Sequence, residues 1–211
     1  MNKRQKQAMQ TKENLVKAAL YLLREKGFPD LTIRDLCQCA EVSIGTFYHY
    51  FSSKEDIINQ GFGFYDLDLE EYLETYVQTN PNPIRAIHDI VMNQTRYVAD
   101  RTAGFTKELY IGMLSIREGY ATRNTRKYYQ TILHYTKEAV QQEIFCTQKS
   151  AEELTEFIIR TNRGDIIDWC LHDYEYDLGK RAHEDLFFIL KGLLRDGAGT
   201  LESYLEEETE E

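Results

Sequence analysis

The chain has 211 residues, enough for one or two domains, and carries a formal net charge of −10. No apolar run reaches the length of a membrane span and no signal peptide opens the chain, so we expect a cytoplasmic protein with no membrane partner. Four cysteines do not make a disulfide framework in a chain of this size, and we expect small, mostly buried thiols instead. With only three prolines and dominant periods of three and four residues, the sequence predicts an all-α fold.

The first segment combines a basic end with an amphipathic helix. Residues 1–12 contain four basic residues and no acid, which predicts a flexible basic arm. Residues 11–26 predict the first helix, because apolar side chains recur on one face: Leu15, Ala18, Ala19, Leu22 and Leu23. Gly27 is typical of a helix C-terminus, and Phe28 and Leu31 are expected to fill the corner that follows.

Residues 32–51, TIRDLCQCAEVSIGTFYHYF, predict two short helices joined by a tight turn. Thr32 can cap the first helix, with Asp35 as the reciprocal partner of a capping box. Ser43 can cap the second helix. Phe47 and Phe51 lie four residues apart, so together they can anchor that second helix to a core.

The other side of the second helix is unusual for a bundle. Gly45 near its start would let the backbone approach a partner closely. The neighbouring hydroxyl, imidazole and phenol groups are donors of the kind that hold phosphate oxygens. A buried aromatic edge beside a hydrogen-bonding edge suits a reader of the DNA major groove. The alternative is a helical hairpin inside a larger bundle, or one that contacts another protein.

Charge is unevenly distributed along the chain. Residues 1–60 contain nine basic and seven acidic residues, so this segment carries +2 and the remainder carries −12. An acidic protein can therefore still present a positive end to nucleic acid. The glutamate-rich residues 201–211 predict a disordered, solubilising acidic tail.

The rest of the chain predicts a helical bundle. A fourth helix starts near Lys54 and is interrupted by Gly61 and Gly63, which favours a bend or a close helix crossing. After the break at residues 80–83, further helices are expected over 83–98, 105–116, 124–145, 150–174 and 180–194. The last two have apolar residues on two faces, so we expect each helix to bury both faces, and Gly164 would permit close helix approach.

Catalytic and metal-binding patterns are missing from the sequence. The five histidines are scattered, and HExxH, CxxC and phosphate-loop motifs do not occur. His172–Asp173 and His183–Glu184 could in principle hold a metal across helices, but solvated polar residues explain them better. We therefore expect no enzyme, no cofactor and no metal site, although an enzyme built on a helical bundle is a rival class.

Residues 11–58 resemble the DNA-binding signature of the TetR family of bacterial transcriptional regulators. The resemblance is carried by Thr32–Ile33, the run VSIGT at 42–46, the aromatic block FYHYF at 47–51, and Lys54–Glu55. Glu41 departs from the glycine that many members have in the turn. The resemblance implies three parts: a helix-turn-helix domain over 1–53, a ligand-binding and dimerisation domain over 54–200, and the acidic tail.

The resemblance also implies roles for individual residues. Base edges would be met by Ile44, Gly45 and Thr46, and phosphates by Thr32, Ser43, Tyr48, His49, Tyr50 and Lys54. An effector pocket would draw on Phe64, Tyr65, Tyr97, Phe105, Tyr110, Met113, Tyr128, Tyr129 and Trp169, although core packing explains each of these residues individually. The expected protein is a homodimer that binds a palindromic double-stranded operator and is released by a small-molecule effector. Repression is the family's usual mode, and activation is the alternative.

Overall fold

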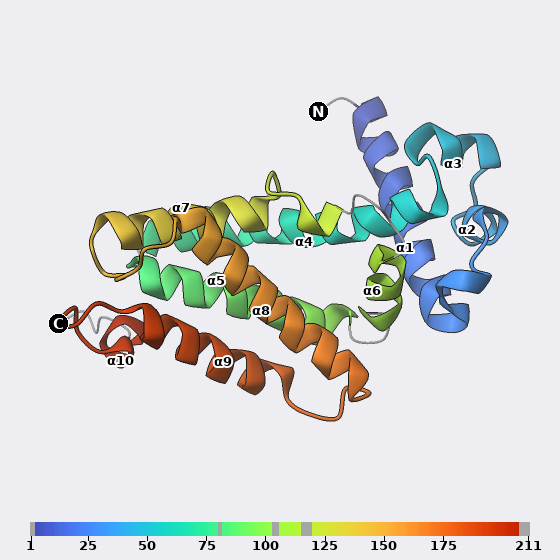
Figure 1. The fold of residues 1–211 in the computed structure, drawn as a ribbon. Coiled ribbons are helices and arrows are strands. Elements are labelled where there is room, and N and C mark those ends of the chain that lie inside the picture. Colours follow the sequence, from blue (N-terminus) through green and yellow to red (C-terminus); the bar gives the residue numbers. More distant parts are fainter. Residues whose placement is uncertain (1–2, 80–81, 103–105, 115–119, 207–211) are drawn as a thin grey trace. The chain divides into compact units, whose positions relative to one another are not determined.

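The computed structural model describes residues 3–79, 82–102, 106–114 and 120–206, apart from some side chains within these ranges. The described part is helical, with a single isolated β-bridge, so the all-α prediction is confirmed (Figure 1). The chain divides into two compact units, one made of residues 1–65 and 102–123 and the other of residues 66–101 and 124–211. No helix in the described ranges is long and apolar enough to cross a membrane.

The first unit contains α1 (Lys3–Asp30), α2 (Ile33–Cys39), α3 (Ile44–Tyr50), the start of α4 (Lys54–Tyr76) and α6 (Thr106–Leu114). The helical backbone begins at Lys3, so the expected flexible basic arm is wrong and those residues extend α1. Gly27 interrupts the helix with φ 73° and ψ 170°, a left-handed φ that glycine adopts without a Cβ clash, and this confirms the predicted end.

The core of the first unit is built from the predicted α1 stripe and from both short helices. Leu15, Ala19 and Leu23 are fully buried, and they pack with the corner residues Phe28 and Leu31. Val16 of α1 also belongs to this core, and the remaining members come from later elements: Leu36, Cys37, Phe47, Phe51, Ile57 and, from α6, Leu109. Residues 102–123 thus belong with the N-terminal unit, which differs from the boundary at residue 53 that the sequence suggests.

The start of α4 is tied to the end of α1 by one side chain. The Lys54 ammonium donates to the carbonyl oxygens of Phe28 (3.1 Å), Pro29 (3.4 Å) and Leu31 (3.1 Å). It also lies 4.5 Å from the centre of the Phe28 ring. The Phe28 carbonyl also accepts the Leu31 N–H at 3.3 Å, and a cation beside carbonyls at a helix C-terminus stabilises that end of the helix. Beyond Lys54, α4 continues as one helix past Gly61 and Gly63, without the interruption expected from the sequence.

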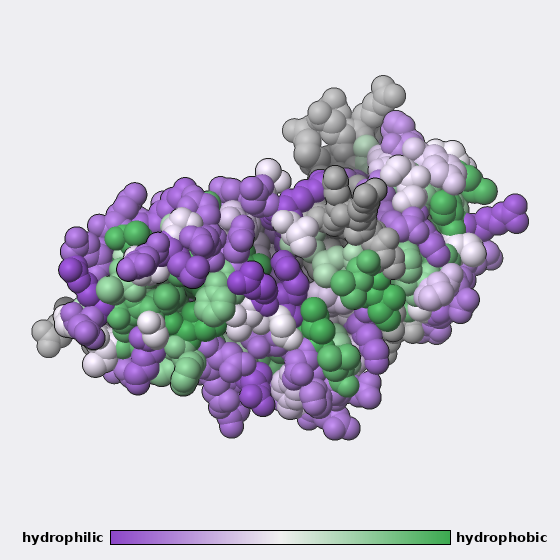
Figure 2. Space-filling model, viewed as in Figure 1, coloured by the Kyte–Doolittle hydropathy of each residue, from purple (hydrophilic) through white to green (hydrophobic). Residues whose placement is uncertain are grey.

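The second unit is a bundle around α5 (Pro83–Tyr97), packed on α7 (Lys127–Gln141), α8 (Ala151–Leu171) and α9 (Leu178–Leu193). These helices confirm the predicted segments, although α7 is shorter than expected. Ser150 and Glu153 form the capping box that starts α8. Figure 2 shows a mostly hydrophilic surface interrupted by hydrophobic patches.

A buried ion pair joins the second part of α4 to the start of α7. Arg126 donates to both oxygens of Asp66, at 3.0 and 2.9 Å, and the two side chains are only 5% and 8% exposed. Asp66 also accepts the backbone N–H of Tyr128 at 3.4 Å, in the first turn of α7. The carboxylate therefore satisfies one of the free N–H groups of that helix and faces the positive end of its dipole.

The C-terminal segment is folded further than expected. Residues Leu201–Leu205 form the short helix α10, capped by Thr200, and Leu201 is buried. Arg85 donates to the carbonyl oxygen of Leu205, and Asn82 donates to that of Tyr204. The expected disordered tail is thus wrong for residues 201–205, and residues 207–211 lie outside the described ranges.

Replacing Lys54 with methionine tests the tie between α4 and α1. The variant keeps the apolar stem but loses three hydrogen bonds from a charged donor, so we expect the free energy of unfolding to fall by about 1–3 kcal/mol. Chemical denaturation of the DNA-free protein measures this directly. Lys17→Met, at an exposed position on α1, is the matched control and should change stability by less than about 0.5 kcal/mol. Equal stability of both variants would contradict the capping role.

Removing one partner of the buried ion pair should lower the free energy of unfolding strongly. Removing both partners should lower it much less. Arg126→Met removes the guanidinium that pairs with the buried Asp66 carboxylate and is expected to destabilise the chain by about 3–5 kcal/mol. The double variant Asp66→Leu/Arg126→Met should recover most of that loss, because no buried charge remains. Urea unfolding of the three proteins measures the difference, and equal losses in the single and double variants would show that the charges are not the cause.

Candidate nucleic-acid interface

The first helix of the motif, α2, is fixed at its start by the predicted capping box. Thr32 Oγ1 accepts the backbone N–H of Asp35 at 3.2 Å, and the Asp35 carboxylate accepts the N–H of Thr32 at 3.0 Å. Lys26 from α1 adds an ion pair to the same carboxylate, which the sequence did not reveal. Hydrogen bonds from Lys26 and then from Thr32 lower the pKa of Asp35 to about 2. The charged carboxylate therefore joins α1 to α2 over the whole physiological pH range.

The turn between α2 and α3 is made by Glu41, which takes a φ of 54°. This left-handed conformation is costly for a residue with a side chain, which explains why glycine suits the position. The Val42 N–H donates to the Cys37 carbonyl at 2.9 Å, and the Cys37 thiol lies 3.7 Å from the Ser43 carbonyl oxygen. Burial raises the pKa of that thiol, so Cys37 acts as a packed side chain.

The four cysteines divide evenly between core and surface. Cys37 and Cys170 are buried as expected, whereas Cys39 and Cys146 are exposed and correct that expectation. Cys39 is the last residue of α2, and its side chain is exposed to solvent.

The second helix, α3, has only seven residues and is held at both ends. Ser43 Oγ accepts the N–H of Thr46 at 3.0 Å and lies 2.8 Å from its hydroxyl, which confirms the predicted cap. Phe47 and Phe51 are buried, with ring centres 5.6 Å apart, which confirms the predicted anchor. Because an isolated helix of this length is unstable in water, these contacts fix its orientation on the domain.

The opposite face of α3 is left to solvent. Ile44 and Tyr48 are 46% and 56% exposed, and Gly45 and His49 are also exposed. These residues pair at spacings of four, 44 with 48 and 45 with 49, so they form one continuous ridge along the helix. A Cβ added at Gly45 would meet no closer atom than Ser43 Oγ, at 3.7 Å. Nothing within the described part of the chain therefore requires a glycine there.

Several of the other predicted contact groups already have partners in the chain. The hydroxyls of Thr32 and Ser43 cap α2 and α3, and the Lys54 ammonium contacts three carbonyls. Tyr50 is half-buried against the core, unlike the exposed Tyr48. A phosphate role for these residues stays a prediction, and for Lys54 the local geometry favours a structural role that the sequence could not indicate.

The predicted effector residues are divided between the two units, so neither unit contains the whole set. Tyr65, Tyr110 and Met113 belong to the first unit, and Tyr97, Tyr128, Tyr129 and Trp169 to the second. Tyr65, Tyr128, Met113 and Trp169 are buried, whereas Tyr97, Tyr110 and Tyr129 are half-buried. Phe105 and the side chain of Phe64 lie outside the described residues.

Two of these aromatic residues have defined surroundings. Trp169 donates its indole N–H to the Tyr176 carbonyl at 2.9 Å and lies 4.7 Å from the Tyr174 ring, so it closes the end of α8. Burial and then the charges of Glu156 and Glu152 raise the pKa of Tyr129.

Comparison with known sequences identifies the N-terminal unit. Residues 15–60 match the family model described as "Bacterial regulatory proteins, tetR family". An uncharacterized HTH-type transcriptional regulator of Mycobacterium bovis is 36% identical over 83 residues, which covers 39% of this chain and 37% of that protein. The chain thus matches little more than a third of the length of this curated relative.

Solved structures of other proteins have a similar fold over most of this chain. The transcriptional regulator FadR from Bacillus subtilis, in complex with stearoyl-CoA, has a TM-score of 0.65 at 17% identity and covers 86% of this chain and 98% of its own. RolR in complex with resorcinol has a TM-score of 0.66 at 16% identity, with coverage of 97% and 98%. Residues 15–60 thus match the TetR family of bacterial regulatory proteins, and the solved structures show that most of the chain shares the fold of such regulators.

Proposed function

We propose that this chain binds a palindromic operator as a homodimer, through α3, and represses transcription until a small-molecule effector releases it. The observation that carries the DNA-binding part is the exposed ridge of α3 with Gly45 in its first turn. A glycine costs helix stability, so one that no internal contact requires is best explained by a partner that approaches the backbone.

The chemistry of the ridge suits the DNA major groove. Ile44 offers an apolar contact for a thymine methyl group, and Tyr48 and His49 offer hydrogen bonds to phosphates or base edges. The positive balance of residues 1–60 favours approach to a polyanion despite the net charge of −10. Two copies would place their α3 helices in successive major grooves, about 34–36 Å apart or a multiple of that spacing.

The second copy is proposed to pack on α8 and α9. Phe157, Gly164 and Leu171 follow one another at heptad spacing along α8, and the two apolar side chains are 42% and 71% exposed. On α9, Phe188 is 83% exposed. A Cβ built at Gly164 would meet no other part of the described chain within 4 Å outside its own stretch of helix, so another helix could approach closely there. Large exposed apolar residues of this kind typically mark an interface.

The effector is proposed to bind within the second unit. Its interior contains polar groups as well as aromatic residues: Asn162 donates to Thr95 at 2.8 Å, and its own carbonyl oxygen is buried with no hydrogen-bond partner in the described part of the chain. A buried acceptor of this kind is stabilised by a ligand or water that donates to it. FadR and RolR were solved with stearoyl-CoA and resorcinol, two very different ligands, so they favour a small-molecule effector without fixing its class.

Substitutions on α3 test the DNA interface. Gly45→Ala should leave the free energy of unfolding unchanged or raise it by up to about 1 kcal/mol, because alanine is the better helix former. Its affinity for the operator should nevertheless fall at least tenfold, since the methyl group blocks close approach. Fluorescence anisotropy with duplexes from the intergenic DNA beside the gene measures the affinity, together with its expected decrease with salt.

Two equally exposed tyrosines provide the matched comparison. Tyr48→Ala on α3 should weaken operator binding, whereas Tyr21→Ala on α1, at 58% exposure, should not. If Gly45→Ala and Tyr48→Ala bound the duplex as tightly as Tyr21→Ala and the unchanged chain, α3 would not be the contact surface.

The homodimer is tested by placing a polar residue on α9. Phe188→Ser should leave the fold intact, because the side chain is mostly exposed in one copy, but should shift the chain from dimer to monomer. Sedimentation velocity at micromolar concentration measures this shift. Val77→Ser, at a 54% exposed position directly after α4, is the control that should remain dimeric. A monomeric unchanged chain would refute the proposed assembly.

A further inference from the structure

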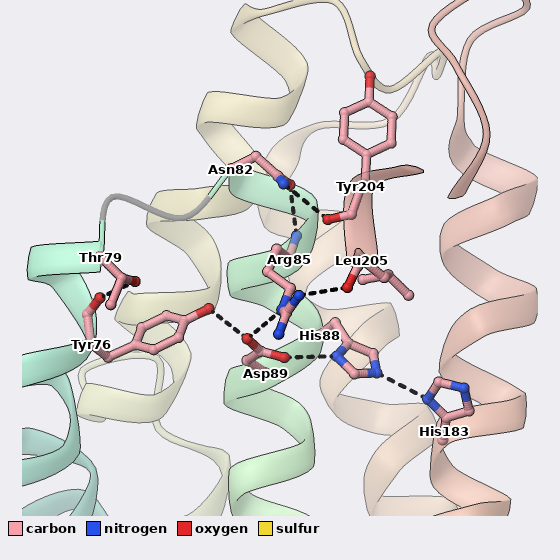
Figure 3. A network of polar contacts seen from close by, with 9 residues as sticks. All are labelled: Tyr76, Thr79, Asn82, Arg85, His88, Asp89, His183, Tyr204 and Leu205. Atoms are coloured by element: carbon pink, nitrogen blue, oxygen red, sulfur yellow. Dashed lines mark hydrogen bonds and ion pairs between the residues drawn. The ribbon is translucent and has the colours of Figure 1, made fainter. Parts of the chain in front are cut away.

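A polar network in the second unit connects α4, α5, α9 and α10 around Asp89 (Figure 3). One oxygen of Asp89 accepts hydrogen bonds from the Tyr76 hydroxyl at 2.9 Å and from Arg85 Nε at 2.8 Å. The other oxygen lies 2.9 Å from His88 Nδ1. His88 Nε2 points away from Asp89 toward His183 Nδ1 on α9, at 3.0 Å.

The protons in this network can be assigned from Asp89. Its carboxylate forms an ion pair with Arg85 and accepts a hydrogen bond from the Tyr76 hydroxyl. An ionised carboxylate only accepts hydrogen bonds, so His88 Nδ1 carries a proton. In the neutral imidazole the lone pair is then on Nε2, the atom that faces His183.

We propose that His88 and His183 together bind a divalent transition metal of the zinc, nickel or copper type, between α5 and α9. The two ring nitrogens face each other from different helices, and Asp89 holds the His88 ring from behind. Histidines that bind metals characteristically donate their second ring N–H to a carboxylate, which fixes the ring and makes the nitrogen more basic. Imidazole pairs favour zinc, copper and nickel over magnesium and calcium, which prefer oxygen ligands.

The spacing of the two nitrogens is close to what such a metal needs. With metal–nitrogen bonds of about 2.0–2.1 Å and a tetrahedral angle, two imidazole nitrogens lie about 3.3 Å apart. The observed 3.0 Å, at present a hydrogen bond between the two rings, therefore has to open by a few tenths of an ångström, and the rings have to turn so that both lone pairs point at the metal. His183 is exposed and can make this adjustment, whereas His88 is held, with a side chain only 15% exposed.

The site would be open rather than fully coordinated by protein. Within the described residues, no group of three or more histidine, cysteine or acidic side chains is placed to hold a metal. Two imidazoles would therefore supply two ligands, with water or an incoming small ligand in the other positions. Zinc sites that keep open positions are those that can take up a further ligand. The inference does not depend on DNA binding.

Isothermal titration of zinc chloride into the tag-free chain tests the site. We expect saturable binding that is lost, or weakened at least tenfold, in His88→Ala and His183→Ala. Asp89→Asn should weaken it by about ten- to hundredfold, because the ring loses its orienting carboxylate. Thermal unfolding provides a second measurement, since the unchanged chain should melt at a higher temperature with zinc and His183→Ala should not.

His134→Ala and His172→Ala are the matched controls, since both remove exposed histidines from elsewhere in the same unit. Both should bind zinc like the unchanged chain, and magnesium chloride should give no saturable heat. The exposed thiols of Cys39 and Cys146 could also take up zinc, but that binding would survive in His183→Ala. Zinc binding that is equal in His183→Ala and the unchanged chain, or no saturable binding at all, would overturn the proposal.

Discussion

The arrangement of the helix-turn-helix motif in the first unit depends on the burial of Phe47 and Phe51. A seven-residue helix has too few internal hydrogen bonds to persist alone, so packing has to hold it. Both rings are buried and they contact each other at 5.6 Å, which commits one side of α3 to the core formed with α1. The opposite side, with Gly45 and Tyr48, is then necessarily presented to solvent. Caps and side-chain ties fix the remaining freedom: Ser43 starts α3, and Asp35 holds α2 to both Thr32 and Lys26.

Buried polar contacts serve a similar purpose in the second unit. Apolar helix faces can slide past one another with little change in buried area, whereas hydrogen bonds between specific side chains hold in one register only. Asp66 with Arg126, and Asn162 with Thr95, fix α4 against α7 and α8 against α5. The Asp89 network adds α9 and α10 to the same bundle. The helical fold therefore combines apolar packing with a few polar contacts whose partners lie far apart in the chain.

Local patterns predicted local structure well. The helix stripe with Leu15 and Leu23, the end at Gly27, and the caps at Thr32, Ser43 and Ser150 all depend on residues within one or two turns, so the sequence was sufficient to place them. Errors arose where a distant partner decides the outcome. Residues 201–205 form a helix because Leu201 is buried and because Arg85 and Asn82, 120 or more residues away, donate to the carbonyls of Leu205 and Tyr204.

The amino-acid sequence by itself determined the helical class and the helix-turn-helix motif, because these follow from periodicity, capping and a compact run of residues over 32–51, and that run also carries the resemblance to the TetR family. Only the tertiary structure decided what individual polar groups do. Lys54 meets carbonyls that lie 23 to 26 residues earlier, and His88 faces a histidine 95 residues later. Such pairings depend on how helices pack in three dimensions, and no local pattern of residues encodes them.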